Sequence, residues 1–258
     1  MSKKSKFLKT EESTVEESVE KDLSEVLEFN IKEYGMSVIE DRMIPSIRDG
    51  LKPSQRRLLK AMYDLKAWST SPTVKSARVT GDCMGKYHPH SEAYGALGGL
   101  VNQTYSLVQG QGNWGSLDDE PAAARYTECR FSKLGQRCFE NYAVADEVPN
   151  FSGEYMEPID IPMDFPLFFV NGGKGIGVAV RLETPDHNLQ EIVEAMKIVL
   201  KKGDKTKMSD LFKVFHGPDS VYGGKLLTSE EELKTIYETG SGKITYECDY
   251  EIAQQGSN

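Results

Sequence analysis

The dipeptide Arg125-Tyr126 pairs a nucleophilic side chain with a cation. A tyrosine hydroxyl has an ordinary pKa of about 10, so it becomes a useful nucleophile only beside cations or against a metal-bound phosphate. Arg125 would supply one such cation. Most tyrosines are packing residues with a polar tip, so the dipeptide alone does not decide between chemistry and packing.

A basic segment, residues 42–57, stands in a chain whose net charge is −9. A basic patch on an acidic body still binds a phosphate backbone, because binding releases condensed counterions. The charge balance therefore confines nucleic-acid binding to one face of the molecule. The only acid of the segment is Asp49, and its cations are Arg42, Arg48, Lys52, Arg56 and Arg57.

Arg56 and Arg57 fall in the first turn of a helix that is predicted after Pro53. Cations at a helix N-terminus oppose the helix dipole, so their presence there favours a functional reason such as phosphate binding. A solvated helix face remains the alternative.

The tripeptide His88-Pro89-His90 holds two of the four histidines. Histidine pairs bind metal ions, but no nearby pair of carboxylates completes a coordination shell, so we predict no metal site. Beside Lys86 and Tyr87, the two imidazoles could equally donate hydrogen bonds to phosphate or simply occupy a turn. The residues themselves leave these interpretations open.

A glycine cluster, NGGKGIG at residues 171–177, invites a nucleotide-binding interpretation. A P-loop requires Ser or Thr after its lysine, whereas Gly175 follows Lys174, and the acidic residue of a dinucleotide fingerprint is missing. We expect instead that these glycines let the backbone approach another surface closely.

Composition places the chain among ordinary globular proteins. No uncharged stretch is long enough to cross a membrane, and the N-terminus has no apolar core that would make it a secretory signal. These features predict a cytoplasmic protein. The four cysteines, at positions 83, 129, 138 and 248, form no C-x-x-C pair, so reduced and mostly buried thiols are expected.

The elements that must position these residues are mainly helical in the first third of the chain. Residues 1–28 are polar and charged, and we assign them to a flexible tail. Apolar residues recur at helical spacing from Leu23 to Ile39 and again, as a stripe, after Pro53. A further helical stretch at 74–84 would complete a helix-turn-helix arrangement.

The later segments alternate between loops, strands and helices. Residues 108–117 are predicted to form an ordered loop, and 165–170 a dense apolar strand. A helix over 189–201 is capped by Asn188, and Ser229 with Glu232 opens another that ends at Gly240. Residues 243–252 alternate in strand fashion, with no partner element evident.

Several long motifs occur in one order: YGMSVIEDRMIPSIRDGLKPSQRRLLKAM, KSARVTGDCMGKYHPH, GQGNWGS, AAARYTE and, later, NGGKGIGVAV and TPDHNL. In this order they closely resemble the A subunit of type IIA DNA topoisomerases, namely bacterial DNA gyrase and topoisomerase IV, and more distantly the medium subunit of phage topoisomerases. The resemblance covers residues 27–252, the N-terminal part of the breakage-reunion domain.

The resemblance implies a role for each matching residue. Tyr126 would attack a backbone phosphate and hold the 5′ end of the broken strand, assisted by Arg125. Arg42, from the same protomer or its partner, would stabilise that phosphate. Ile176 would be a wedge that enters a base step and bends the DNA. The residues expected to hold the DNA backbone are Lys52, Arg56, Arg57, His88 and His90.

The resemblance also implies partners. Double-stranded DNA would be bound by a homodimer that forms through the winged-helix region, because each strand needs its own tyrosine. Magnesium and ATP are expected on a separate B subunit, and no cofactor on this chain. The resemblance predicts an α+β fold, with a winged-helix domain at 29–148 and a truncated α/β tower at 149–258.

Three departures limit what carries over from the family. The segment between His90 and Gly110 is shorter than the family pattern, which puts quinolone contacts in doubt, and Gln55 replaces a histidine usual in gyrase. The chain also lacks the rest of the tower, the dimer gate and any DNA-wrapping domain. Gyrase and topoisomerase IV are therefore not distinguished, and the isolated chain is expected to be inactive alone.

Two functions of different class follow from this sequence. The first is DNA cleavage and religation for ATP-dependent strand passage, performed with a B subunit. For a split gene, a complementary C-terminal fragment would also be needed. The alternative is a non-catalytic DNA-binding or regulatory fragment of a split or truncated topoisomerase. Only the first function requires Tyr126 as a nucleophile.

Overall fold

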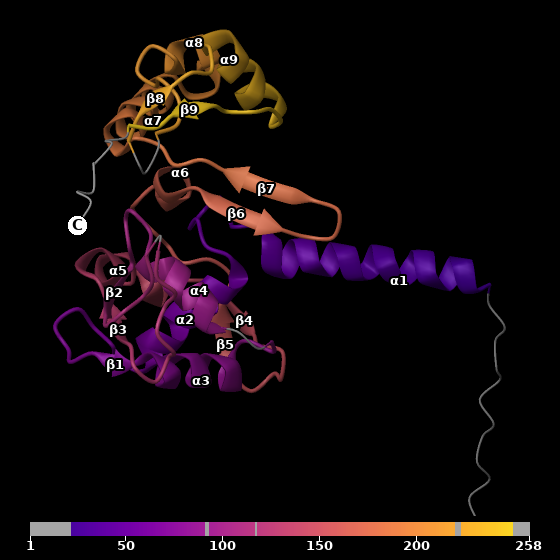
Figure 1. Ribbon diagram of the computed structural model, residues 1–258, viewed down its shortest axis with the longest axis vertical. Helices are drawn as coiled ribbons and strands as arrows, with labels where there is room; N and C mark the ends of the chain where they lie inside the picture. The colour runs from indigo at the N-terminus through magenta and orange to yellow at the C-terminus, as the bar shows by residue number, and fades with distance from the viewer. Residues whose placement is uncertain (1–21, 91–92, 117, 220–222, 250–258) are drawn as a thin grey trace, which may run out of the picture.

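The computed structural model describes residues 22–90, 93–116, 118–219 and 223–249. Helices and short antiparallel sheets alternate along it, which confirms the predicted α+β class. Figure 1 shows a body built from the first part of the chain, a two-stranded hairpin above it, and a smaller C-terminal unit, residues 189–249.

The body combines several helices with a three-stranded sheet. The strands lie in the order β1-β3-β2, and both pairings are antiparallel. A short hairpin, β4 paired with β5, closes the body. The elements are α2 (Pro53–Asp64), β1 (Val74–Lys75), α3 (Ser76–Lys86), α4 (Ala93–Val101), β2 (Val108–Gln111), β3 (Glu128–Phe131), α5 (Lys133–Cys138), η2 (Tyr142–Val144), β4 (Glu147–Pro149) and β5 (Met156–Pro158).

Helix α2 begins where the sequence predicts. Pro53 occupies the first turn at no cost in hydrogen bonds, and the Gln55 side chain accepts a bond from the Lys52 N–H at 3.0 Å. The predicted apolar stripe is buried at Leu58, Leu59 and Met62. Helix α3 likewise confirms the predicted helical stretch, although it starts at Ser76 rather than residue 74.

One apolar core fills the body between the helices and the sheet. Three cysteines lie in it, as expected, and burial raises the pKa of both Cys83 and Cys129 to about 12, so these thiols stay protonated at neutral pH. Cys248 is exposed. The largest fully buried side chains in the body are Leu51, Leu58, Leu59, Met62, Val79, Leu97, Leu100, Leu107, Phe131, Ile161 and Leu167.

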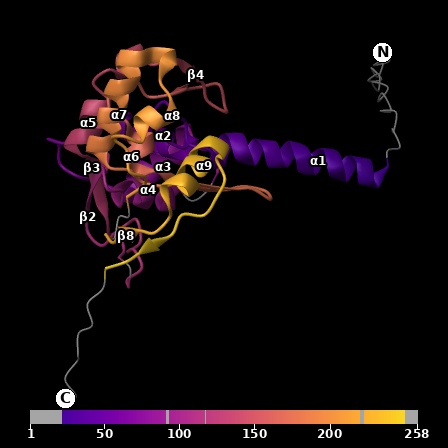
Figure 2. The same cartoon turned by 90° about the horizontal axis from the view of Figure 1, so that it is seen from above.

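Helix α1 (Leu23–Val38) projects from the body and continues into a π-helical turn, η1 (Ile39–Met43), as Figures 1 and 2 show. The predicted helix is confirmed, but it includes residues 23–28, which the sequence had placed in the tail. Residues 1–21 of that tail lie outside the described residues. The apolar side chains of α1 are mostly exposed, since only its C-terminal end, at Gly35 and Val38, is buried.

The predicted strand over 165–170 is wrong. Residues Leu167–Asn171 form the short helix α6, and the glycine cluster itself supplies strand β6 (Gly173–Ile176), paired with β7 (Arg181–Thr184). Short apolar runs do not distinguish a buried helix from a strand. Close backbone approach is confirmed at Gly175, where a Cβ would lie 2.5 Å from the Met43 carbonyl oxygen.

The C-terminal unit confirms both predicted helix caps. Asn188 accepts from the Gln190 N–H at 2.9 Å, Ser229 and Glu232 form a reciprocal capping box, and Gly240 ends the last helix in the left-handed region. Strand β9 does have a partner, β8, contrary to the sequence interpretation. The elements are α7 (Leu189–Lys202), η3 (Gly203–Lys205), α8 (Met208–Leu211), β8 (Lys225–Leu226), α9 (Glu230–Thr239) and β9 (Tyr246–Glu247).

Two further observations concern the chain as described. The segment predicted as an ordered loop, 108–117, begins as strand β2, because Val108–Gln111 pair with Glu128–Phe131 of β3. None of the helices in the described ranges is both long enough and apolar enough to cross a membrane.

Candidate functional site

The Tyr126 side chain is exposed at the surface of the body, with 65% of its area accessible. The guanidinium carbon of Arg125 lies 4.5 Å from the centre of its ring. A guanidinium over a phenol ring is attracted by the ring's quadrupole, which holds the two side chains together. Arg125 and Tyr126, the pair that the sequence singled out, therefore lie side by side at the surface.

The backbone around this pair is held against the N-terminal end of α3. The Ser76 N–H donates to the Thr127 carbonyl and the Ala77 N–H to the Ala124 carbonyl, each at 3.1 Å. These are the first amides of the helix, which have no partner inside the helix and are free to bind the turn. Tyr126 is thus an exposed side chain on a fixed backbone.

A second group of predicted residues gathers at the other end of α3. Arg42, at the end of η1, places a guanidinium nitrogen 2.8 Å from His90 Nε2, although 48 residues separate them in the sequence. His88 lies beneath them, with its ring centre 5.4 Å from that of His90. The fold therefore brings together an arginine and two histidines that the sequence assigned to phosphate.

Both histidines of this group favour the neutral form. Burial, followed by the charges of Arg57, His90 and Arg42, lowers the pKa of His88 to about 4. Burial and Arg42 also lower the pKa of His90. His88 Nδ1 is buried and has no hydrogen-bond partner among the described residues. An anion that bound here would raise both pKa values and offer that nitrogen a partner.

Arg56 does not face a ligand, contrary to the role expected from the resemblance. Its side chain is buried and donates to both carboxylate oxygens of Asp49, at 2.7 and 2.9 Å, and to the Leu51 carbonyl at 3.0 Å. Asp49 also accepts from the Ile161 N–H at 2.9 Å. This buried ion pair ties the turn before α2 to the segment after β5.

Arg57 and His88 are also less accessible than a backbone-binding role suggests. Arg57 is half-buried and makes a two-pronged bond to Glu157, at 2.7 and 2.8 Å, which raises its pKa. His88 is buried beside it. By contrast, the side chains of Arg42 and His90 are exposed.

Lys52 and Ile176 lie near the glycine hairpin. The Lys52 ammonium donates to the Lys174 carbonyl, and both residues line a cleft of about 930 Å³ between the body, the hairpin and the C-terminal unit. Ile176, at the end of β6, is 81% exposed. Its side chain therefore does not pack against the rest of the described chain.

The Tyr126 pair and the Arg42 group do not meet within one chain. They sit at opposite ends of α3, whose 11 residues span about 16 Å at 1.5 Å per residue. Among the described residues, no hydrogen bond or ion pair joins them. The fold therefore assembles two half-sites on each chain rather than one site.

Sequence reasoning missed the residues that hold these groups in place. Thr127, Ser76 and Tyr94 fix the tyrosine turn, while Asp49 and Glu157 hold the two arginines. Asp49 is the only carboxylate within the basic segment, and this position in the sequence already indicated that it could pair with one of the arginines. Nothing local marked Tyr94 or Glu157, because their partners are distant in the sequence.

Comparison with known families decides the class of this protein. The family model for the A subunit of DNA gyrase and topoisomerase IV matches residues 42–257. The chain belongs to this family. The match includes Arg42, both histidines, the tyrosine turn and the glycine hairpin, so both half-sites described above lie within it.

Individual members of the family resemble the chain over most of its length. The topoisomerase 4 A subunit of Neisseria gonorrhoeae is 41% identical over 85% of this chain and 30% of its own length. The gyrase A subunit of Thermotoga maritima is 42% identical over 82% of this chain and 27% of its own. The topoisomerase 4 A subunit of Escherichia coli K12 is 41% identical over 86% and 31%, respectively. The chain thus spans under a third of the length of these relatives.

Proposed function

We propose that this chain is a type IIA topoisomerase subunit that transiently cleaves and religates double-stranded DNA through a 5′-phosphotyrosyl bond at Tyr126. The observation that carries the proposal is an exposed tyrosine under an arginine, on a turn fixed to a helix end, in a chain of this family. ATP-dependent strand passage would follow when a B subunit joins it.

The chemistry conserves a phosphate ester. The Tyr126 hydroxyl oxygen attacks the phosphorus in line and loses its proton, the bond to the 3′ oxygen breaks, and the departing strand end takes up a proton. Religation reverses each step, so neither direction needs fuel. Such transfers depend mostly on position and on charge stabilisation at the phosphate, which Arg125 and the exposed Arg42 supply.

The separation of the two half-sites supports a homodimer. Arg42 and His90 of one chain would serve the phosphate that the partner's tyrosine attacks, because α3 keeps them away from Tyr126 of their own chain. We therefore propose that Arg42 serves the active site of the other protomer rather than its own. A homodimer also provides one tyrosine for each strand.

DNA would cross the body near the hairpin. Lys52 and His90 would hold the backbone, with Arg57 and His88 behind them as supporting groups, and Ile176 would enter a base step. The helices and sheet at 29–148 would form the winged-helix domain, and residues 149–258 part of the tower. Inserting an apolar wedge costs a few kcal/mol, which contacts along the bent DNA offset.

Magnesium and ATP would be supplied by the B subunit. Within the described ranges, no three His, Cys, Asp or Glu side chains converge as metal ligands would. A bound metal ion would add charge stabilisation at the same phosphate. We place the assembly in the cytoplasm, where its partners would be DNA, a B subunit and, for a split gene, a complementary C-terminal fragment.

Covalent trapping tests the proposal. The chain is incubated with supercoiled DNA, magnesium and a family B subunit, the reaction is stopped with detergent, and DNA-linked peptides are mapped after digestion. We expect the phosphotyrosine at Tyr126. Tyr126→Phe should bind DNA with unchanged affinity and form no adduct, whereas Tyr34→Phe, which alters another exposed tyrosine, should behave as the wild type.

Two results would contradict cleavage by this chain. An adduct at a different residue would remove Tyr126 from the reaction. DNA binding without any adduct, in parallel with a control reaction in which a full-length family member is active, would favour the non-catalytic DNA-binding fragment instead.

A further inference from the structure

Three hydroxyl groups meet behind the tyrosine turn. Thr127 Oγ1 lies 2.9 Å from the Tyr94 hydroxyl and 2.9 Å from Ser76 Oγ. The residues come from three places in the chain: α4, the turn itself and the first position of α3. Ser76 and Thr127 are completely buried, so the hydrogen bond between them forms away from water.

The hydroxyl cluster, Tyr94, Thr127 and Ser76, holds the backbone on both sides of Tyr126. The Tyr94 hydroxyl donates to the Ala122 carbonyl at 2.6 Å, four residues before the nucleophile. Thr127, directly after it, carries the other contacts. The cluster therefore clamps the two ends of a short turn and leaves the Tyr126 side chain itself untouched.

The opposite side of the turn meets the GQGNW segment. Gly112 has a φ of +101°, and a Cβ there would lie 3.4 Å from the Tyr126 carbonyl oxygen and from Thr127 Cγ2. Glycine both adopts this conformation and lets the two backbones approach. Tyr94 in turn packs against Trp114, with ring centres 5.5 Å apart.

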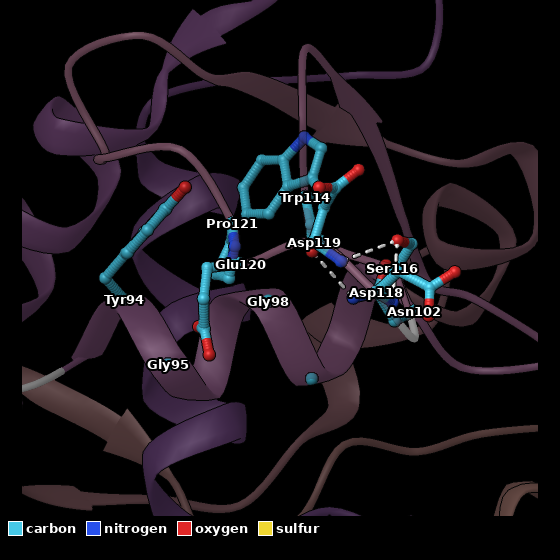
Figure 3. A pocket seen from close by; sticks show the side chains of 12 residues that line it. Tyr94, Gly95, Gly98, Asn102, Trp114, Ser116, Asp118, Asp119, Glu120 and Pro121 are labelled. Atoms are coloured by element: carbon cyan, nitrogen blue, oxygen red, sulfur yellow. Dashed lines mark hydrogen bonds between the residues drawn. The ribbon is translucent and has the colours of Figure 1, made fainter.

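Tyr94 also borders open space. Figure 3 shows its side chain beside a groove that is lined by α4, by residues 114–116 and by residues 118–121, including Trp114 and Pro121. The groove has a volume of about 540 Å³. The Tyr126 turn thus lies between α3 and the loop that contains Trp114. The Tyr94 hydroxyl connects α4 to this turn through hydrogen bonds.

We propose that Tyr94 and Thr127 are positioning residues, which hold the Tyr126 turn so that its hydroxyl meets the phosphate in line. The effect of this positioning on cleavage rests on the function proposed above. The ordering of the turn by Tyr94 and Thr127 does not depend on that function. A misplacement of about 1 Å can cost on the order of a hundredfold in rate. Polar clamps of this kind fix geometry, while the apolar core beneath them supplies most of the stability.

Amide hydrogen exchange of the free chain tests the positioning directly. The Tyr126 N–H donates to the Ala123 carbonyl at 2.8 Å and reports on the order of the turn. Thr127→Val and Tyr94→Phe should raise its exchange rate roughly threefold to tenfold, the value of one lost hydrogen bond. Thr127→Ser keeps the hydroxyl and should restore the wild-type rate.

Two controls separate positioning from a general loss of stability. Tyr142→Phe removes a hydroxyl of the same kind, bonded to Glu147 at 2.5 Å, and should leave Tyr126 exchange unchanged. The Phe131 N–H, bonded to the Ala67 carbonyl at 2.7 Å in the core sheet, should exchange at the wild-type rate in every variant. Equal acceleration at Phe131, or no acceleration at Tyr126, would overturn the proposal.

Covalent trapping then measures the catalytic consequence. With DNA, magnesium and a B subunit present, Thr127→Val and Tyr94→Phe should form adducts on the order of tenfold to a hundredfold more slowly, at unchanged DNA affinity, and Thr127→Ser should recover the rate. A wild-type rate in both hydroxyl-free variants would overturn the proposal. If the wild-type chain forms no adduct while exchange responds as expected, the positioning stands and the cleavage function fails.

Discussion

At the scale of single residues, the hydrogen-bond partners and the burial of each cation in the basic segment determine its role. Arg56 is buried and paired with Asp49, while Arg42 is exposed and its side-chain hydrogen bonds among the described residues go to His90. The two arginines are equivalent in type and lie close in sequence. Burial with a carboxylate makes one a structural residue and leaves the other available to phosphate.

Replacing Arg56 should damage the fold, whereas replacing Arg42 should damage function. Arg56→Ala leaves the buried Asp49 carboxylate unpaired, so the free energy of unfolding should fall by about 3–5 kcal/mol. Arg42→Ala should change it by less than about 0.5 kcal/mol and slow adduct formation. Denaturant titration measures the first effect and trapping the second. Equal stability of both variants would contradict the assignment.

His88 should make stability depend on pH. Its pKa of about 4 in the folded chain lies below its ordinary value, so the unfolded state binds more protons between those two values. Stability should therefore decrease as the pH falls from about 6.5 to about 4, and His88→Gln should flatten that slope. His216→Gln, at an exposed histidine, serves as the control. If His88→Gln left the pH dependence of the free energy of unfolding unchanged, a group other than His88 would be responsible for it.

At the scale of elements, short segments hold the site residues at fixed places. The N-terminal end of α3 holds the tyrosine turn, its C-terminal end leads to the histidines, and the β6–β7 hairpin extends Ile176 into solvent. The hairpin can do so because Gly175 packs against the Met43 backbone without a side chain between them. The proposed DNA wedge would therefore stand at the end of an anchored hairpin.

Ile176→Ala should reduce DNA bending without destabilising the chain. The side chain is exposed, so its loss should change the free energy of unfolding by less than about 0.5 kcal/mol. Energy transfer between dyes at the ends of a short duplex, bound to the dimer with its B subunit, measures the bend. Leu227→Ala, another exposed aliphatic change, should leave the bend as in the wild type. Equal bending by both variants would remove Ile176 as the wedge.

At the scale of the whole molecule, Arg42 and Tyr126 lie at opposite ends of α3. In the proposed dimer, a complete site would therefore join the tyrosine of one copy with the arginine of the other.

Mixed dimers should show that the site is shared. A dimer of one Tyr126→Phe chain and one Arg42→Ala chain should keep one complete site and therefore attach to one DNA strand. Trapping followed by denaturing electrophoresis should reveal single-strand breaks. If each chain used its own Arg42, this dimer would form adducts no faster than an Arg42→Ala homodimer.

Local patterns were enough to identify much of this protein. Motif order pointed to the family, helical spacing and caps predicted α1, α2, α7 and α9, and the glycine cluster indicated close backbone approach. These features depend on residues within a few positions of one another. Short apolar runs carry no such information about helix or strand, which is why α6 was predicted as a strand.

Only the tertiary structure decided which candidates share a site and which are structural. Asp49 and Glu157 hold Arg56 and Arg57, Arg42 meets His90, and Tyr94 reaches the tyrosine turn, all through contacts between distant segments. Burial and pairing are set by the packing of whole elements, and they determine whether a charge or hydroxyl faces water, a partner or DNA. Residue types alone state what chemistry is available, whereas packing determines where it can act.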